Sequence, residues 1–353
     1  MVDKIPDSSI RRTQVVLLIV ALAGLHFLLI CAGFFAPYDA TSQDRELPYA
    51  PPTRIHFCDA SGFHSRPFIY AWTPSGADTD SSGSYREDRS HEYPVHFFVR
   101  GASYDILGVF ESSWHLFGVD APGKLMLFGA DAFGRDEFSR VLFGGQISVA
   151  AGIVATLLAL ATGSVLGIIA GFYGGWIDES LMGLTELFLS LPWLYFLLGV
   201  RAFLPLHLST LRTFFLLTGV IGLIGWGRPA RLIRGLVLSL RHRNFVLAAR
   251  GFGAADFYLL RRHILPETFG LLLTQAAMLV PRYIAAEVTL SFFGLGVNEP
   301  VPSWGNMLST LQQYSVLVSY DWLLAPAGAV VVTSVLYSLL ADLFHSRLKS
   351  QST

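Results

Sequence analysis

Residues 147–171 read ISVAAGIVATLLALATGSVLGIIAG and contain no charged side chain. A helix needs about 20 apolar residues to cross a bilayer, so this stretch is long enough to span a membrane. The 353-residue chain is 52% hydrophobic and 14% charged, whereas soluble domains are about 25% charged. A formal net charge of −1 argues against a nucleic-acid partner, because nucleic-acid binders present a basic face. The sequence therefore predicts an all-α polytopic protein in a lipid bilayer.

Five further apolar runs bring the predicted number of transmembrane helices to six: residues 14–36, 181–204, 213–235, 269–291 and 323–344. The first run is too long for the core of a signal peptide and is expected to be retained. Pro192 and Pro281 interrupt two runs and are expected to kink them. Small residues at Gly163, Gly167 and Gly171 recur every fourth position, which favours close packing of the second helix against a neighbour.

Basic residues predict the orientation of these helices. Lys4, Arg11 and Arg12 precede the first run, which places the N-terminus in the cytoplasm. By counting crossings, the segment after the fourth run is also cytoplasmic. It holds eight arginines: Arg228, Arg231, Arg234, Arg241, Arg243, Arg250, Arg261 and Arg262. Residues 294–321 contain no Lys or Arg, as expected outside, and the tail at 346–353 is predicted to be cytoplasmic.

A long polar segment, residues 37–128, separates the first two spans and is predicted to be an extracytoplasmic insert. Three alternating stretches favour short β-strands: RIHFC (54–58), RPFIYAW (66–72) and VHFFVR (95–100). The polar run at 74–92 predicts a mobile loop. This small β-containing insert either shields an outer opening or docks a partner. A disulfide between Cys31 and Cys58 would require Cys31 near the outer surface, and we expect none.

The arginine-rich segment contains FVLAARGFGAADFYLLRRHILPE (245–267), which predicts two short helices. The first, Asn244–Arg250, is expected to end at Gly251 and Gly253, because glycine accepts the left-handed conformation of a helix end. Asp256 is then expected to cap a second helix at 257–264.

The end of this segment is expected to form a corner. Arg261, Arg262 and His263 would lie near the negative end of the second helix. Pro266 disfavours a helical Leu265, so the chain should turn before the fifth span. Ala248 and Ala249 give one face small side chains, which suits close contact with another surface. The alternative is a solvated basic loop that serves membrane topology alone.

Motifs for nucleotide binding and catalysis are missing from the sequence. GFGAAD (251–256) resembles the start of a dinucleotide fingerprint, but no strand precedes it and Asp256 stands where the last glycine belongs. There is no GxxxxGK[ST], no HExxH and no pair of intramembrane aspartates. We therefore expect no enzyme activity, no cofactor and no metal.

Polar side chains inside membrane helices are functional candidates by default. Glu186 lies about two turns into the third span and is expected to pair with a partner chain. Arg282 and Glu287 lie in the outer half of the fifth span. They either line a passage or pair within the helix bundle.

Several motifs together resemble one family. They are GADAFGRDEFSR (129–140), GFYGGWIDE (171–179), ARLIRGLVLSLR (230–241), and LSFFGLGV followed by PSWGNML (290–308), besides the loop residues Ala248, Ala249, Gly253 and His263–Pro266. Over residues 129–345 the chain resembles the inner-membrane permease subunits of binding-protein-dependent ABC importers of the dipeptide, oligopeptide and nickel type. Ala130 replaces the usual Thr, and Leu247 replaces the usual Glu.

The resemblance implies a MetI-like core of five helices plus an N-terminal helix, in a bacterial inner membrane. The cytoplasmic loop at 236–268 would be the coupling element, docking on a separate ATPase subunit. The implied partners are two ATPases, a second permease and an extracytoplasmic substrate-binding protein. Peptides, nickel chelates and some sugars are all cargoes of such relatives. The rival hypotheses are a secondary transporter or channel driven by an ion gradient, and a receptor that does not transport.

Overall fold

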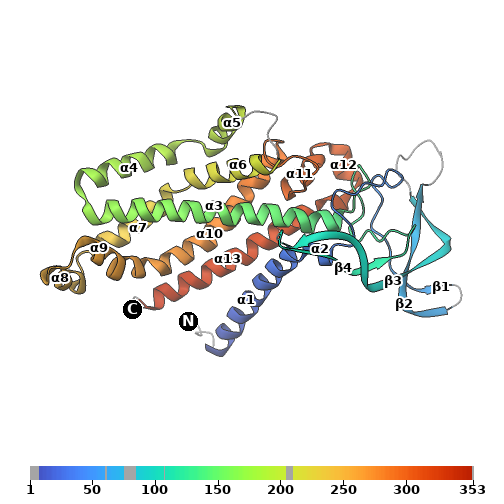
Figure 1. The fold of residues 1–353 in the computed structure, drawn as a ribbon, viewed down its shortest axis with the longest axis horizontal. Coiled ribbons are helices and arrows are strands. Elements are labelled where there is room, and N and C mark those ends of the chain that lie inside the picture. The colour runs from blue at the N-terminus through green and yellow to red at the C-terminus, as the bar shows by residue number, and fades with distance from the viewer. Residues whose placement is uncertain (1–7, 60–61, 75–84, 107, 204–209, 352–353) are drawn as a thin grey trace, which may run out of the picture. The chain divides into compact units, whose positions relative to one another are not determined.

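The computed structural model describes residues 8–59, 62–74, 85–106, 108–203 and 210–351. Contacts divide the chain into two compact units, which are described separately. The first unit comprises residues 1–22, 149–287 and 333–353, and the second comprises residues 23–148 and 288–332. Figure 1 shows the order of the elements, which are mostly helices with a group of strands between residues 56 and 119.

Five helical segments of the described chain are long and apolar enough to cross a membrane: Thr13–Ile30, Glu137–Tyr173, Arg212–Leu240, Asp256–Phe292 and Asp321–Ser346. A further pair, Gly175–Ser190 and Tyr195–Arg201, passes the same test together but is bent by 85°. The described residues thus contain five candidate spans, or six if the bent pair counts as one. The helical membrane fold predicted from the sequence is confirmed at this level.

The first unit contains most of the helix bundle. Its helices are α4 (Gly175–Ser190), α5 (Trp193–Phe203), α6 (Thr210–Ile224), α7 (Gly227–Leu240), α8 (Asn244–Gly251) and α9 (Asp256–Leu259), together with parts of α1 (Ser8–Ile30), α3 (Glu137–Tyr173), α10 (Leu265–Phe292) and α13 (Ala325–Gln351). A π-helix at Leu260–Ile264 joins α9 to α10.

The third predicted span is not one kinked helix, as the sequence suggested, but two helices. Leu191 between α4 and α5 has φ −69° and ψ 128°, an extended conformation. The ring of Pro192 disfavours the helical region for the residue before it, so the helix ends there. By contrast, α10 continues through Pro281.

Helices α3 and α7 pack closely where α3 has glycines. A Cβ atom at Gly163, Gly167 or Gly171 would lie within 3 Å of backbone oxygens of Trp226, Ala230 and Arg234 respectively. The three glycines face one partner helix because positions four apart share a face.

The second unit contains four antiparallel strands in sequential order: β1 (His56–Asp59), β2 (Gly62–Pro74), β3 (Tyr85–Ile106) and β4 (Phe110–Val119). The three predicted strands are confirmed. The predicted loop at 74–92 is wrong for residues 85–92, which belong to β3. There Glu87 pairs with Trp72 and Glu92 with Tyr70. An antiparallel sheet with a solvated face accepts polar residues, so polarity alone did not indicate a loop. Residues 75–84 of that prediction lie outside the described residues.

Short helices complete the second unit: α2 (Ala32–Phe35), α11 (Trp304–Ser309), α12 (Tyr314–Ser319) and 3-10 turns at Thr310–Gln312 and Asp321–Leu324. Ser303 and Asn306 form a reciprocal capping box at the start of α11. Trp304 is 1% exposed, and its indole Nε1 donates to the Val141 oxygen at 2.9 Å. The PSWGN motif thereby fixes α11 against α3 within this unit.

Candidate functional site

The arginine-rich segment at residues 236–268 is folded against the ends of two membrane helices. Val246, Leu259 and Ile264 of this segment are buried. They form one hydrophobic cluster with Phe172 of α3 and with Ile233 and Val237 of α7. The segment is therefore an ordered, anchored part of the first unit and not a freely solvated loop.

Gly253 turns the chain between the two short helices. Its φ is +83°, in the left-handed region. The Gly253 amide donates to the Arg250 oxygen at 3.0 Å, and the Ala254 amide donates to the Ala249 oxygen at 3.1 Å. This pair of bonds is the Schellman motif that closes a helix on glycine. The first predicted helix and its glycine end are thus confirmed, with Gly251 as the last residue of α8.

The predicted role of Asp256 as a helix cap is wrong. Ala255 occupies the capping position, and α9 has no side-chain capping bond. Asp256 is the first residue of α9, and an Asp256 oxygen lies 3.5 Å from Arg250 Nη2. An acidic residue in the first turn still interacts favourably with the helix dipole, so its position suits a helix start without a cap.

The predicted corner at Pro266 is also wrong. Leu265 is helical, with φ −56° and ψ −43°, and α10 begins there directly after the π-helix. A proline ring normally clashes with the carbonyl four residues before it. A π turn, with its wider i→i+5 spacing, relieves that clash. The segment therefore continues into the fifth membrane helix without a break.

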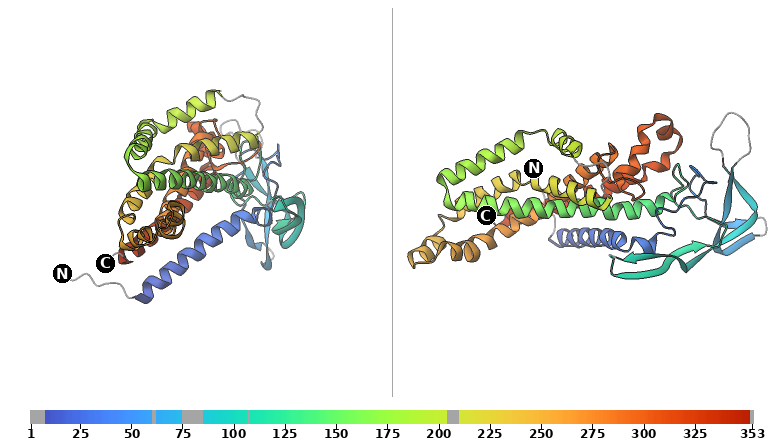
Figure 2. Two further views of the ribbon diagram at one scale, coloured as in Figure 1. Left: turned by 60° about the vertical axis from the view of Figure 1, so that its left-hand side comes forward. Right: turned by 45° about the horizontal axis from the view of Figure 1, so that its top comes forward.

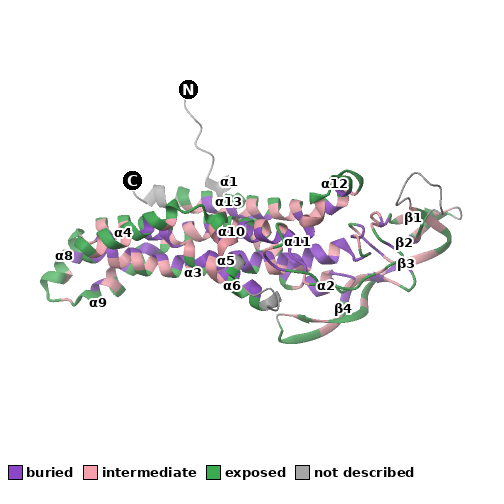
Figure 3. Cartoon of the chain, turned by 90° about the horizontal axis from the view of Figure 1, so that it is seen from above, coloured by how far each residue is buried: buried purple, intermediate pink, exposed green. Residues whose placement is uncertain are grey.

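The outward face of the segment carries exposed apolar side chains. Phe252 is 92% exposed and Phe257 is 73% exposed, and Leu247 and Tyr258 are about half exposed. Figure 3 shows α8 and α9 largely in the colour of exposed residues. Such side chains outside a lipid-facing helix are unusual for a free surface and typical of a contact surface.

The remaining predicted residues of the segment surround this face. Ala248 and Pro266 are exposed and Ala249 is half-buried. His263 is half-buried, and its ring contacts the rings of Phe245 and Tyr258 at 5.8 Å and 5.7 Å between centroids.

Ion pairs fix the first turns of α4 against α7. Both carboxylate oxygens of Asp178 accept from the Arg234 guanidinium, one of them at 2.5 Å. Arg241 donates to the Gly171 oxygen at 3.1 Å. The GFYGGWIDE and ARLIRGLVLSLR stretches are therefore joined directly, beside the hydrophobic cluster.

Glu186 has a partner in its own chain. Its carboxylate lies 3.3 Å from Arg231 Nη2, and Glu186 is exposed. Pairing of Glu186 with another chain stays a prediction, and Arg231 of α7 is its neighbour within this chain. Arg282 is exposed and Glu287 is 5% exposed, so these two predicted residues differ in environment.

The sequence matches the family described as binding-protein-dependent transport system inner membrane component over residues 163–350, more than half of the chain. The chain belongs to this family of membrane permeases. Its members are transport subunits and not enzymes. A putative peptide permease of Brucella ovis is 37% identical over 223 residues, which cover 63% of this chain and 72% of that protein.

Other relatives and structures resemble the permease. The oligopeptide transport system permease protein OppC of Escherichia coli is 37% identical over 215 residues, covering 61% of this chain and 69% of that protein. Among solved structures, an inward-facing MetNI methionine ABC transporter is similar with a TM-score of 0.44 and 15% identity, over 59% of this chain and 95% of that one.

One charged residue of the predicted third span was not among the sequence candidates. Arg201 of α5 is 8% exposed, and its Nε and Nη1 atoms are buried without a hydrogen-bond partner among the described residues. The signal was present in the sequence, because Arg201 lies inside the apolar run at 181–204.

A charged network of the second unit joins two of the permease motifs. Arg135 donates to Asp131 at 2.7 Å and to Glu299 at 2.5 Å, and Arg140 donates to Glu299 at 2.8 Å. Burial acts to raise the pKa of Glu299, but the Arg140 and Arg135 guanidinium groups outweigh it and lower that pKa. This network ties residues 129–140 to the segment after α10.

Asp136 lies beside this network and has a different environment. Its Oδ2 accepts from the Ser139 amide at 2.8 Å and from the Ser139 hydroxyl at 2.6 Å. Its Oδ1 is buried without a partner among the described residues. Burial raises the pKa of this carboxyl to about 6, although the bonds from Ser139 act in the opposite direction.

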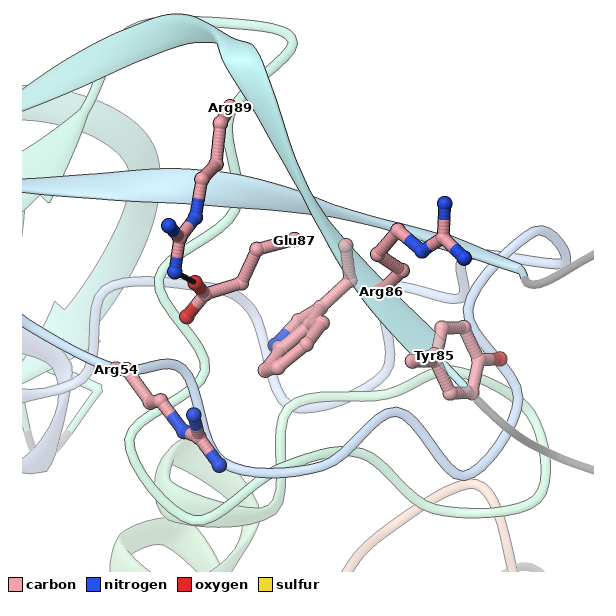
Figure 4. Close-up of a pocket in the computed structure, with 6 residues that line it drawn as sticks. Arg54, Tyr85, Arg86, Glu87 and Arg89 are labelled. Carbon is pink, nitrogen blue, oxygen red and sulfur yellow. Dashed lines mark ion pairs between the residues drawn. The ribbon is translucent and has the colours of Figure 1, made fainter.

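The β-strands of the permease hold a cavity of about 490 Å³, lined by Arg54, Trp72, Tyr85, Arg86, Glu87 and Arg89 (Figure 4). Glu87 lies 3.6 Å from Arg89 and 3.1 Å from His56. Nearby in the sheet, Asp59, His64 and Glu92 place one potential metal ligand each within 4.8 Å of one another. Within this group His64 Nε2 lies 3.0 Å from Asp59. Cys31 and Cys58 are free.

Proposed function

We propose that this permease is one membrane subunit of an ATP-driven importer, and that the segment at 236–268 couples it to a cytoplasmic ATPase subunit. The observation that supports the proposal is that the segment has one buried side and one exposed apolar side. One side is anchored in the bundle through Val246, Leu259 and Ile264, and the other exposes Phe252 and Phe257. An element that transmits force needs both an anchor and a contact surface.

The mechanism is a domain motion biased by ligand binding. Closure of two ATPase subunits around ATP would pull two such segments, one on this chain and one on a second, similar permease. The movement would pass through the cluster beneath α8 and along α10, and switch a shared pathway between inward-facing and outward-facing states. A substrate-binding protein would deliver cargo on the other side of the membrane.

The cargo we propose is peptides or similar small solutes. The support is the naming of the relatives as peptide and oligopeptide permeases. Arg201, Arg282 and Glu287 are proposed to meet charged peptide termini, because intramembrane charges mark substrate pathways. The N- and C-termini are proposed to lie in the cytoplasm, in keeping with the arginines around α7 and α8.

Reconstitution into vesicles tests the proposal. The permease co-expressed with its cognate subunits should copurify with two ATPase copies and one second permease, and should take up peptide in an ATP-dependent way. Vanadate should stop this uptake and a protonophore should not. Uptake that survives vanadate but collapses with the proton gradient would establish a secondary transporter instead. The isolated chain should hydrolyse no ATP.

A further inference from the structure

The β3–β4 hairpin runs back along the end of the first membrane helix. His115 of β4 bonds the Ala36 oxygen through Nδ1 at 2.6 Å, and Gly33 of α2 leaves just enough room for the ring of Tyr104 on β3. Nearer the hairpin tip, the contacted residue is Gly33 instead of Ala36. The tip therefore points back toward α1, which precedes Gly33 in the chain. Figures 1 and 2 show the hairpin beside α2, and all of these residues belong to the second unit.

These contacts set the depth of the hairpin tip. Ile30 is the last residue of α1 and lies three residues before Gly33, about 4.5 Å further along at 1.5 Å per residue. Val109 lies three residues beyond Ser112, which pairs with Tyr104. At about 3.3 Å per residue, Val109 is roughly 10 Å beyond the level of Gly33. The tip therefore reaches about 5 Å past the level of Ile30, where α1 ends.

The side chains along the hairpin change from residues typical of the headgroup region to exposed apolar residues at the tip. At the level of Ala36, the Arg100 guanidinium lies 5.1 Å from the ring centre of Trp114, which is exposed. Arg and Trp are residues of the headgroup region. At the tip, Val109 is 72% exposed and Phe110 is 69% exposed. The sequence is ILGVF at 106–110, with no polar side chain.

We propose that the tip of the β3–β4 hairpin is inserted in the lipid leaflet in which α1 ends. The occupant of this apolar surface is lipid, because the tip lies beyond the level at which α1 ends, and only 11% of the apolar window of α1 is buried by the rest of the chain. Burial of about 5–10 Å is the depth at which amphipathic elements bind the headgroup and acyl boundary. The insert is thereby tethered to the membrane at a second point, independently of the coupling role proposed above.

Two acidic residues limit the depth of insertion. Asp105 and Glu111 face each other across the strands and are both exposed. Like charges directly opposite one another are unfavourable unless water or headgroups solvate them. They lie close to the level of Ile30, so that only Ile106, Val109 and Phe110 among the described tip residues pass below the boundary.

Site-directed labelling in the assembled transporter tests this proposal. Cys31 and Cys58 are replaced by Ser, and a single cysteine at Val109 (V109C) is labelled with a fluorophore. The complex is reconstituted in vesicles of phosphatidylethanolamine and phosphatidylglycerol containing doxyl-labelled phosphatidylcholine. We expect doxyl lipid to quench the label at 109 at least threefold more strongly than a label at Phe63 (F63C), and aqueous iodide to show the reverse order.

Phe63 is the matched control, because it is an exposed aromatic residue at the opposite hairpin, between β1 and β2. Equal quenching by iodide at both positions would show that the tip is in water and would overturn the proposal. A label at 109 that neither quencher reaches would show a protein partner over the tip and would overturn the assignment to lipid. A cysteine at Phe110 (F110C) repeats the measurement should V109C fail to assemble.

Discussion

Gly253 combines a left-handed backbone with open space around its missing side chain. No atom lies within 4 Å of the position of an added Cβ. A substitution there therefore causes backbone strain of about 1–2 kcal/mol without a clash inside the chain. A β-branched side chain is worse in this region. We expect Gly253→Val to leave membrane insertion and abundance nearly unchanged but to reduce uptake and substrate-stimulated ATP hydrolysis several-fold, since coupling between sites is typically worth 1–3 kcal/mol.

Gly251→Ala is the control for this change. Gly251 is helical and also has no neighbour within 4 Å of its Cβ position, so alanine should be tolerated. Uptake and ATP hydrolysis of both variants are measured in the same reconstituted complex. Wild-type transport by Gly253→Val would remove this segment from the coupling pathway.

Asp136 predicts a pH dependence of stability. Its pKa rises from the ordinary 3.8 to about 6 on burial, so the folded state holds this proton more tightly than the unfolded chain does. The stabilisation is fully present below about pH 4 and is lost as the pH rises through 6, a change of about 3 kcal/mol. Asp136→Asn keeps a good capping side chain without the charge. We expect it to be more stable than wild type at pH 7 and equal near pH 4 by thermal unfolding in detergent.

An exposed aspartate of the same unit provides the comparison. Asp39 accepts bonds from Thr41 in a turn, and Asp39→Asn is the matched removal of one exposed carboxylate. A slope in Asp136→Asn as steep as that of the wild type would show that another group titrates in this range.

At the level of single residues, features set by the local backbone were predictable from the sequence. Features that depend on contacts with other residues were not. Gly253 was predictable because a left-handed helix end needs glycine. The capping role of Asp256 failed because Ala255 takes that position and Arg250 reaches the carboxylate. The prediction of a corner at Pro266 was wrong because a π-helix precedes the proline and lets the helix continue. No residue pattern in this segment indicated the π-helix. The charge partners of Glu186 and Glu299 lie 45 and 159 residues away and depend on the tertiary fold.

Helices α3 and α7 provide a prediction at the level of elements. A Cβ at Gly167 would lie 2.5 Å from the backbone oxygen of Ala230, which cannot move without shifting α7. Overpacking of this kind costs about 1–3 kcal/mol. We therefore expect Gly167→Ala to lower the thermal unfolding temperature and the yield of the solubilised protein.

Gly183 of α4 is a matched helical glycine with no atom within 4 Å of its Cβ position. Alanine favours a helix over glycine by about 1 kcal/mol, so Gly183→Ala should be neutral or slightly stabilising. Equal unfolding temperatures for the two variants would contradict tight packing of α3 on α7.

The secondary structure was predictable where composition alone decides it. Apolar runs identified the membrane helices, but α3 begins ten residues before the predicted run. Its first turns contain Glu137 and Arg140, and an acidic residue in the first turn interacts favourably with the helix dipole, so the polar residues did not mark the helix start. The polar start of β3 was missed for a related reason, because its partner strand, and not its own composition, makes it a strand.

At the scale of the whole molecule, the predicted orientation in the membrane can be measured directly. Cys58 is exposed in the insert and Ala255 is exposed between α8 and α9. In spheroplasts, an impermeant maleimide should label Cys58 in a Cys31→Ser background. A single cysteine at Ala255 should react only after the membrane is permeabilised. The opposite pattern would invert the topology and place the exposed face of Phe252 and Phe257 away from any cytoplasmic ATPase.

The uninterrupted helical run from α9 into α10 acts as a lever. From Asp256 to Glu287 it has 31 steps, or about 47 Å at 1.5 Å per residue. A tilt of only about 5° at the α9 end would displace Glu287 by roughly 4 Å, slightly more than the rise of one residue in an extended peptide. With the coupling proposed here, a small rotation at the ATPase contact would be amplified along this helix. The resulting displacement at Glu287 would be about the length of one residue of an extended peptide.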